Sequence, residues 1–216
     1  MGKVRVNIGC GQSPTPGWKN IDNSPSLRLA KIPVLPQMLT SVGLISKRQA
    51  SFIDFCREHS IETGNATKGL PLKSGSVEVI YASHMFEHLD RQEADMFLNE
   101  ARRILCSGGI IRLAVPDIRM RAERYMTSGD ADAFIASTNM TRARPRTLAA
   151  KLGILAVGTR QHQWMYDGAS LARLLESRGF VKARALKAGE TMIADPGELN
   201  LREREDESVY VEAVNP

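Results

Sequence analysis

The chain of 216 residues is poor in cysteine and has no long apolar run. Its three cysteines, Cys10, Cys56 and Cys106, are odd in number and far apart, so a disulfide framework is not expected. No stretch approaches the roughly 20 apolar residues of a membrane-spanning helix, and the first residues are typical of a strand rather than of a signal sequence. These absences favour a reducing, cytoplasmic location and a single domain over residues 1–216.

Near its start the chain contains a short apolar strand that runs directly into Gly9-Cys10-Gly11. Two glycines in three positions let the backbone bend sharply and approach a ligand closely. Open α/β sheets bind small molecules at the carboxyl ends of their strands. A second strand-like run, residues 18–22, ends in Asp22, whose carboxylate suits a ribose diol. Together these features predict a nucleoside-containing cofactor.

The chain lacks the signatures of two common phosphate-binding sites. It has no Gly-Lys-Ser/Thr loop, and Pro14 stands where a dinucleotide fingerprint needs its third glycine. Asp22 comes only 11 residues after Gly11, which leaves little room for a helix whose N-terminus would hold a pyrophosphate. A cofactor with ribose and adenine but no phosphate fits better than NAD, and S-adenosylmethionine is the obvious candidate.

Apolar periodicities alternate between strand and helix along the rest of the chain, which predicts an α/β fold. Asp90 and Glu93 predict a capping box at the start of a helix that residues 107–109 end. The last two strands have no helix between them and are expected to be antiparallel. The expected later strands are residues 61–65, 77–82, 110–115, 180–186 and 208–214, and a second helix is expected at 169–178.

Two segments, about 23–60 and 117–161, interrupt this alternation and are predicted to be lid-like insertions. The segment 23–60 has helical patterning near 37–59, and the segment 117–161 is predicted to be largely helical with a break near residues 144–146. Residues 119–160 carry eight basic and three acidic side chains, a balance of +5, whereas residues 195–212 carry seven acidic and two basic ones, a balance of −5. The basic segment favours an acidic substrate, a phosphate group or an anionic membrane surface. A solvated helical face is the alternative.

A set of short motifs follows one another in a characteristic order: residues 7–11, 69–72 with 76–80, 83–89, 103–109 and 177–180. In this set the chain resembles the class I S-adenosylmethionine-dependent methyltransferases, and more narrowly the small methyltransferase type 11-like bacterial proteins associated with polysaccharide biosynthesis. The resemblance implies a Rossmann-like fold with a mostly parallel seven-stranded sheet, an antiparallel last strand and helices on both faces. It also implies S-adenosylmethionine as the cofactor.

The resemblance assigns a set of cofactor-binding residues. Asp22 would hold the ribose, and Ser83 and His84 would lie at the methionine end. Asn7 and Asn65 stand where the family usually has acids, so they keep hydrogen-bonding capacity but lose a charge. The short link to Asp22 implies that the first helix is reduced to a turn. The full set is Asn7, Gly9, Cys10, Gly11, Asp22, Asn65, Ala66, Ser83 and His84.

Methyl transfer from a sulfonium is an in-line displacement that depends on positioning. A hydroxyl acceptor also needs a base, and His84 and His162 are the candidates because histidine titrates near neutral pH. Residues 84–88 also match the H-x-x-E-H pattern of inverted zinc peptidases. Since His84 is expected at a strand–helix junction, no metal site is expected there. Packing of His88 at the helix start, with Glu87 favoured by the helix dipole, is the alternative.

Trp164 and Tyr166 lie in a polar, aromatic stretch next to the basic segment. They are interpreted either as a platform for a sugar ring or as core anchors before a helix capped by Asp167. The expected acceptor is a small molecule or a glycan. An anionic acceptor, for instance a phosphorylated or lipid-linked sugar, fits the basic segment. Apolar residues within 148–157 suit peripheral contact with the inner membrane.

Two other functions remain as alternatives. The first is a methyltransferase fold without activity, which binds the cofactor or serves as a scaffold. The second is a nucleic-acid methyltransferase, which the arginine-rich stretch supports but the lack of an Asn-Pro-Pro-Tyr tetrad argues against. Nucleic acid is therefore not the expected partner, and no oligomeric state is predicted.

Overall fold

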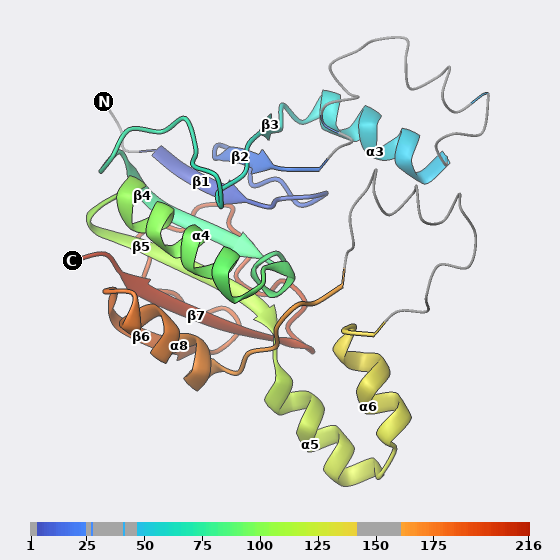
Figure 1. Ribbon diagram of the computed structural model, residues 1–216. Coiled ribbons are helices and arrows are strands. Elements are labelled where there is room, and N and C mark those ends of the chain that lie inside the picture. Colours follow the sequence, from blue (N-terminus) through green and yellow to red (C-terminus); the bar gives the residue numbers. More distant parts are fainter. Residues whose placement is uncertain (1–3, 25–26, 28–40, 42–46, 142–160) are drawn as a thin grey trace.

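The computed structural model describes residues 4–24, 27, 41, 47–141 and 161–216. Within these ranges seven strands form one sheet in the order β3-β2-β1-β4-β5-β7-β6 (Figure 1). β7 is antiparallel to both of its neighbours, and the other pairs are parallel. The predicted mixed sheet is confirmed. The strands are β1 Val4–Ile8, β2 Lys19–Asp22, β3 Glu62–Thr63, β4 Val77–Ser83, β5 Leu105–Pro116, β6 Val181–Leu186 and β7 Ser208–Val214.

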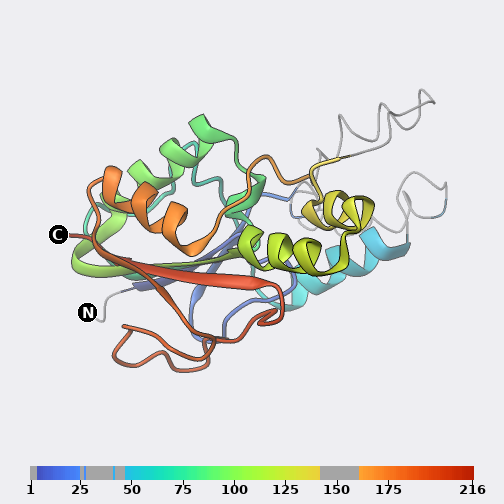
Figure 2. The same ribbon diagram turned by 90° about the horizontal axis from the view of Figure 1, so that it is seen from below.

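In the described part of the chain, α4 and α8 cover one face of the sheet, and α5 and α6 lie beyond the carboxyl ends of its parallel strands. Figures 1 and 2 show α4 and α8 side by side on one face, and the loop 187–207 beneath the opposite face. Figure 1 shows α5 continuing directly from the end of β5. The helices are α3 Lys47–Glu58, the 3-10 turn η1 Phe86–His88, α4 Arg91–Ile104, α5 Ile118–Ser128, α6 Ala131–Thr138 and α8 Gly168–Ser177.

The start of α4 confirms the predicted capping box. The Asp90 carboxylate accepts a hydrogen bond from the Glu93 N–H at 2.8 Å, and the Glu93 carboxylate accepts one from the Asp90 N–H at 3.2 Å. The predicted end of this helix at residues 107–109 is wrong, because β5 already begins at Leu105. The Gly108 N–H donates to the Asn215 carbonyl at 2.8 Å, and the Asn215 N–H donates to the Gly109 carbonyl at 2.9 Å. Pairing with the C-terminal residues therefore holds this segment in the sheet.

A buried ion pair ties the loop 187–207 to the sheet. Arg112 of β5 and Glu212 of β7 are fully buried, with 2.6 Å between Nη1 and Oε1. The Glu212 carboxylate also accepts hydrogen bonds from the Thr191 hydroxyl and the Met192 N–H. Because both charges have partners, the pair tolerates burial, whereas loss of one partner typically costs about 3–5 kcal/mol.

The two segments predicted as insertions are described only in part. α3 accounts for the later half of the helical pattern at 37–59, and the residues before it are mostly outside the described part of the chain. α5 and α6 confirm helical structure over the first part of 117–160, while the expected break at 144–146 and the apolar positions 148–157 lie outside the described residues. In the described ranges, no helix has the length and apolar character needed to cross a bilayer.

Candidate functional site

The predicted cofactor residues meet at the carboxyl ends of β1, β2 and β3. The Gly9 N–H donates to the Ile21 carbonyl at 2.7 Å, which brings the glycine turn beside the end of β2. The Gly64 N–H donates to the Asp22 carbonyl at 3.0 Å, which joins the ends of β2 and β3. This edge is where an open α/β sheet offers backbone groups to a ligand.

The two glycines of the turn serve different purposes. Both have positive φ, +72° at Gly9 and +50° at Gly11. A Cβ at Gly9 would lie 2.7 Å from the Cβ of Met85, whereas nothing lies within 4 Å of a Cβ at Gly11. Gly9 is therefore required by close packing against Met85, and Gly11 leaves open space where a ligand can approach the backbone.

The Asp22 carboxylate is held in place by the turn that it faces. Its Oδ2 accepts a hydrogen bond from the Gly11 N–H at 3.0 Å, and its Oδ1 accepts one from the Ser24 N–H at 2.7 Å. Asp22 is half-buried, and a carboxylate oxygen has capacity for a second hydrogen bond. The group is thus fixed in position and still able to accept hydrogen bonds from the two hydroxyls of a ribose.

Asn7 braces the loop between β1 and β2 from beneath. Its buried amide donates to the Ser13 carbonyl at 3.0 Å and to the Thr15 hydroxyl at 3.1 Å. Asn20, which was not among the predicted site residues, accepts from the Thr15 N–H at 2.8 Å. No helix forms over residues 9–18, as the short link predicted. Direct contact between Asn7 and the cofactor stays a prediction.

The side chain of Cys10 is turned into a small apolar cluster with Leu27, Cys56 and Ile61. Burial, with an added effect of the nearby Asp22 charge, raises the pKa of the Cys10 thiol to about 12. The same causes raise the pKa of Cys56 to about 11. Because the thiol is neutral and enclosed, only the backbone of Cys10 is suited to contact a cofactor.

Asn65 and Ala66, predicted beside adenine, lie just beyond β3. The Asn65 side-chain oxygen accepts hydrogen bonds from both the N–H and the hydroxyl of Thr67, at 2.9 and 2.8 Å. Ala66 is buried in the main core. The oxygen of Asn65 is therefore used to shape the turn, so its contact with adenine stays a prediction.

Ser83 and His84 lie at the carboxyl end of β4. The hydroxyl of Ser83 is buried and has no hydrogen-bond partner among the described residues. His84 has φ +47°, uncommon for a residue with a side chain. Its N–H donates to the Ala114 carbonyl at 2.9 Å, and its Nε2 lies 2.9 Å from the Ser208 hydroxyl. Neighbouring strands thus hold His84 in a conformation it would not adopt alone.

Three histidines surround the buried carboxylate of Glu87. Its Oε1 lies 3.5 Å from His84 Nδ1, 4.0 Å from His88 Nε2 and 3.8 Å from His162 Nε2. The segment carrying His162 is attached here because the Gln163 N–H donates to the Glu87 carbonyl at 2.7 Å. We call Glu87 with His84, His88 and His162 the histidine–Glu87 cluster. Both candidate bases belong to it.

Burial lowers the pKa of His162, and the Glu87 carboxylate opposes only part of that effect. At neutral pH the His162 ring is therefore neutral and able to accept a proton. Glu87 and Ser208 were not among the predicted site residues. The H-x-x-E-H pattern marked Glu87, whereas nothing near Ser208 in the sequence indicates its position beside His84.

Trp164 and Tyr166 were interpreted either as a platform for a sugar ring or as core anchors, and the structure separates them. Tyr166 is 1% exposed in the core, and Asp167 caps α8 as predicted. Trp164 is 45% exposed, so its interpretation as a core anchor is wrong. The guanidinium of Arg91 lies 5.0 Å from the centre of the Trp164 ring. The backbone N–H of Trp164 also donates to the Glu87 carbonyl, so the backbone of Trp164 is attached to the residue at the centre of the histidine–Glu87 cluster.

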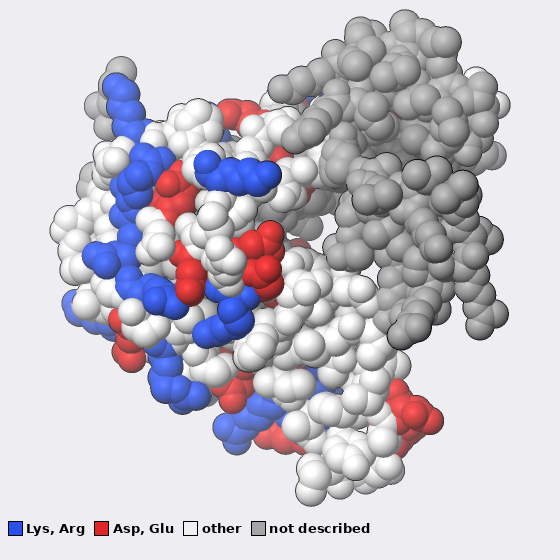
Figure 3. All heavy atoms as spheres, viewed as in Figure 1, with Lys and Arg blue, Asp and Glu red and all other residues white. Residues whose placement is uncertain are grey.

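The basic character of residues 119–160 is partly neutralised where it is described. Arg119 pairs with Glu123 at 2.9 Å, and Arg121 pairs with Glu207 of the acidic segment at 3.2 Å. The surface over α5 and α6 in Figure 3 is largely uncharged, with isolated residues of both signs. Arg124 donates to the Asp206 carbonyl of the acidic segment. The other five basic residues lie outside the described part of the chain, namely Arg142, Arg144, Arg146, Lys151 and Arg160.

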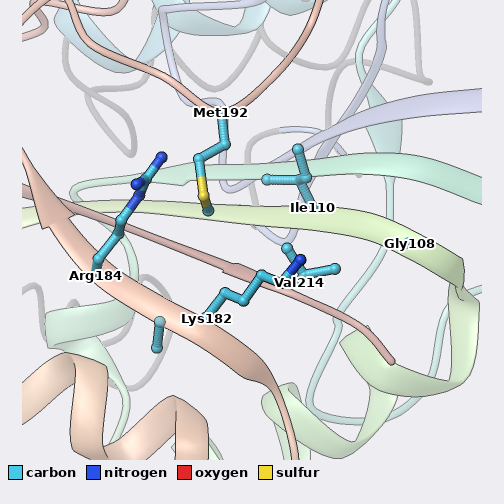
Figure 4. Close-up of a pocket in the computed structure, with 7 residues that line it drawn as sticks. Gly108, Ile110, Lys182, Arg184, Met192 and Val214 are labelled. Atoms are coloured by element: carbon cyan, nitrogen blue, oxygen red, sulfur yellow. The ribbon is translucent and has the colours of Figure 1, made fainter.

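An open groove of about 610 Å³ lies elsewhere on the molecule (Figure 4). It is lined by Gly108 and Ile110 at the beginning of β5, and Met192 extends toward it from the loop above. Ser83 and Pro116 mark the carboxyl ends of β4 and β5. The groove is therefore at the opposite end of the sheet from the predicted cofactor residues and is not the site described above.

Comparison with known proteins agrees with this arrangement. The methyltransferase domain family Methyltransf_11 matches residues 6–113, half of the chain. A Thermotoga maritima protein described as a possible histamine N-methyltransferase superposes with a TM-score of 0.54 at 15% identity, covering 100% of this chain and 84% of that one. A Pyrococcus horikoshii protein superposes with a TM-score of 0.50 at 13% identity, over 99% and 82%. No curated protein matches the sequence.

Proposed function

Because the chain belongs to this methyltransferase domain family and is an S-adenosylmethionine-dependent methyltransferase, we propose that it methylates a small or glycan-type acceptor at the carboxyl edge of the sheet. The observation that carries the proposal is the meeting of two groups at this edge. The glycine turn and Asp22 are joined at the ends of β1 and β2, and the histidine–Glu87 cluster begins directly after Ser83 at the end of β4. In-line transfer requires cofactor and acceptor sites that adjoin in this way.

The residues present fit S-adenosylmethionine. Open space beside Gly11, the spare hydrogen-bonding capacity of Asp22 and the unpartnered hydroxyl of Ser83 all lie along one edge. When bound, the cofactor supplies a methyl group already activated by its sulfonium. We assign the ribose to Asp22, the adenine side to Asn65 and Ala66, and the methionine end to Asn7, Gly9, Cys10, Gly11, Ser83 and His84.

The chain's part in the reaction is to position the acceptor and to take its proton. His84 is the first candidate base because it follows Ser83 directly and its Nδ1 faces the Glu87 carboxylate at 3.5 Å. His162 is the second candidate, and its neutral ring at neutral pH is suited to the same task.

A sugar-containing acceptor is supported by Trp164. Its exposed ring lies beside the Arg91 cation, so an apolar face and a positive charge are offered together, and its backbone is bonded to Glu87. This combination suits a phosphorylated or otherwise anionic glycan of polysaccharide biosynthesis. We further propose that segments 23–60 and 117–161 form the acceptor lid within a single domain. Cytoplasmic location, with peripheral membrane contact for a lipid-linked acceptor, fits the same proposal.

Calorimetric titration with S-adenosylmethionine and S-adenosylhomocysteine tests the cofactor site. We compare the unaltered protein with Asp22→Asn, which keeps the shape of the side chain but removes its charge. Asp132→Asn, on the exposed first turn of α6, is the matched control. Binding that is lost in Asp22→Asn and kept in Asp132→Asn supports the site. Equal binding by all three proteins would contradict it.

Turnover on glycosides tests the acceptor. Phosphorylated and neutral sugars are compared with radiolabelled S-adenosylmethionine as the methyl source. Faster methylation of phosphorylated sugars supports the anionic acceptor, and a preference for neutral glycosides would contradict it. Tight cofactor binding without turnover on any acceptor would favour the second candidate, a cofactor-binding scaffold. The uncharged Asn7 and Asn65, where the family usually has acids, are what favours that candidate.

A further inference from the structure

The carboxylate of Glu87 is buried without the partners that such a group needs. Glu87 is 1% exposed, and neither carboxylate oxygen has a hydrogen-bond partner in the described part of the chain. A buried polar group left unsatisfied typically costs about 1–3 kcal/mol, and more when it is charged. The nearest groups are imidazole nitrogens at 3.5 to 4.0 Å, which is too far for hydrogen bonds.

The same spacing suits a cation between these groups. Glu87, His88 and His162 each offer one oxygen or nitrogen ligand atom, and these three atoms lie within 4.8 Å of one another. The edge of a tetrahedral zinc site is about 3.3–3.4 Å, as follows from metal–ligand bonds of about 2.0–2.1 Å. Glu87 Oε1 lies 3.8 and 4.0 Å from the two imidazole nitrogens, and all three ligand atoms lie within 4.8 Å of one another. Binding an ion would therefore draw these side chains together.

A hydrogen bond on the other side of its ring orients His88 so that one nitrogen is free to bind a metal ion. Its Nδ1 lies 3.1 Å from the Gln161 carbonyl, which can accept a hydrogen bond only from a protonated Nδ1. In a neutral ring the lone pair is then on Nε2, the atom that faces Glu87. Metal-binding histidines characteristically have such a carbonyl or carboxylate behind them. His162 is placed by the Gln163 N–H, which donates to the Glu87 carbonyl.

We propose that Glu87, His88 and His162 bind one divalent transition-metal ion, with Zn²⁺ as the best-fitting member of that class. Two imidazoles and one carboxylate form a recurrent zinc donor set that leaves a fourth position open. His88 is 32% exposed, so this position is reachable from solvent. The proposal departs from the expectation that the chain binds no metal.

The arrangement differs from the zinc-peptidase pattern that the sequence contains. In a helical site of the H-x-x-E-H type the two histidines, here His84 and His88, would hold the metal and the glutamate would be the base. Here Glu87 is itself a ligand, and its partner His162 comes from a segment more than 70 residues away. His84 remains on the other side of the carboxylate. If the proposed function holds, this leaves His84 as the base and offers the acceptor oxygen the open metal position.

Titration of tag-free, metal-stripped protein with Zn²⁺ tests the site without reference to turnover. We expect one equivalent to bind, and Co²⁺ to give the visible absorption of a four- or five-coordinate ion. Glu87→Gln, His88→Gln and His162→Gln should each weaken Zn²⁺ binding by at least about 100-fold, more than the roughly 10–100-fold effect of altering an outer-shell partner. His59→Gln is the control, because His59 is the one histidine of the chain outside the histidine–Glu87 cluster and lies exposed just after α3, stacked on Phe55.

Thermal melting with and without Zn²⁺ provides a second readout. A ligand that binds only the native state raises the midpoint of unfolding. We expect Zn²⁺ to raise it in the unaltered protein and in His59→Gln, and not in Glu87→Gln or His162→Gln. If a core variant fails to fold, the half-exposed His88→Gln still decides the question. Absence of binding to the unaltered protein, or equal binding by His88→Gln, would overturn the proposal.

Discussion

The glycine turn and the histidine–Glu87 cluster lie at the same edge of the sheet but are built differently. In the turn, Gly11 and Asp22 are 11 residues apart and joined by one hydrogen bond. In the cluster, Glu87 lies beside His162, which is more than 70 residues further along the chain. His84 lies beside Ser208, which is 124 residues further along the chain. Local hydrogen bonds make the first region readable from sequence. The second exists only because the fold brings distant segments together.

If the two regions divide the work as proposed, His84→Asn should separate acceptor chemistry from cofactor binding. Asparagine tolerates positive φ, so the backbone at the end of β4 should persist. We expect kcat to fall about 10²–10⁴-fold, the usual contribution of a general base, and S-adenosylmethionine affinity to fall by the smaller factor of about tenfold or less, because His84 is also assigned to the methionine end. Steady-state kinetics and calorimetry measure the two effects. Unchanged turnover with normal cofactor binding would remove His84 as the base.

Gly9→Ala should damage the local region instead. A left-handed residue with a side chain costs about 1–2 kcal/mol, and the added Cβ would collide with Met85. Overpacking of this kind adds about 1–3 kcal/mol. Gly17→Ala is the matched control. Gly17 has φ +74° in the same loop, but a Cβ added there would have nothing within 4 Å. Urea unfolding should show the larger loss for Gly9→Ala, together with about tenfold or greater weakening of cofactor binding. Equal losses in both variants would show that contact with Met85 is unimportant.

Asn7→Ala probes the brace beneath the turn. It removes two hydrogen bonds, to Ser13 and Thr15, each worth about 0.5–1.5 kcal/mol. We expect the free energy of unfolding to fall by about 1–3 kcal/mol and cofactor affinity to fall several-fold. Asn200→Ala, at an exposed turn, is the control. Loss of stability with undiminished affinity would separate Asn7 from the cofactor site.

The smallest functional effect concerns the thiols behind the turn. Burial raises the pKa of Cys10 to about 12 and that of Cys56 to about 11, and only the thiolate reacts with thiol reagents. At pH 8 the more exposed Cys106 should react first, and Asp22→Asn should speed the reaction of Cys10. Above about pH 9 the unfolded thiols ionise before the folded ones, so stability should fall as pH rises. Peptide mapping after timed alkylation gives the order, and early labelling of Cys10 would contradict its burial.

Features set by neighbouring residues could be predicted from sequence. The capping boxes at Asp90 and Asp167 need only residues three positions apart, and the bounds of β1 and β7 follow from short apolar runs. The link from Gly11 to Asp22 was too short for a helix, and a turn is what forms.

Features that depend on distant partners were missed or misread. Residues 107–109 have the composition of a helix end, yet Asn215 pairs with them and extends β5. From its sequence neighbours, Glu87 is typical of a helix start. Its contacts with His162 and Gln163 depend on the fold, which brings the segment 161–163 beside it. Trp164 is typical of a core residue by its type, and its exposure depends on how that segment crosses η1.

Met85 links the two regions mechanically. Its side chain packs on Gly9, and it lies two residues before Glu87. A cofactor that shifts the turn, or an ion that draws Glu87 toward His162, must act on the same methionine. Any such effect is reciprocal, so each ligand changes the affinity of the other by one common factor. Occupancy of one site would then report on occupancy of the other, with the packing of Met85 on Gly9 as the contact that couples them.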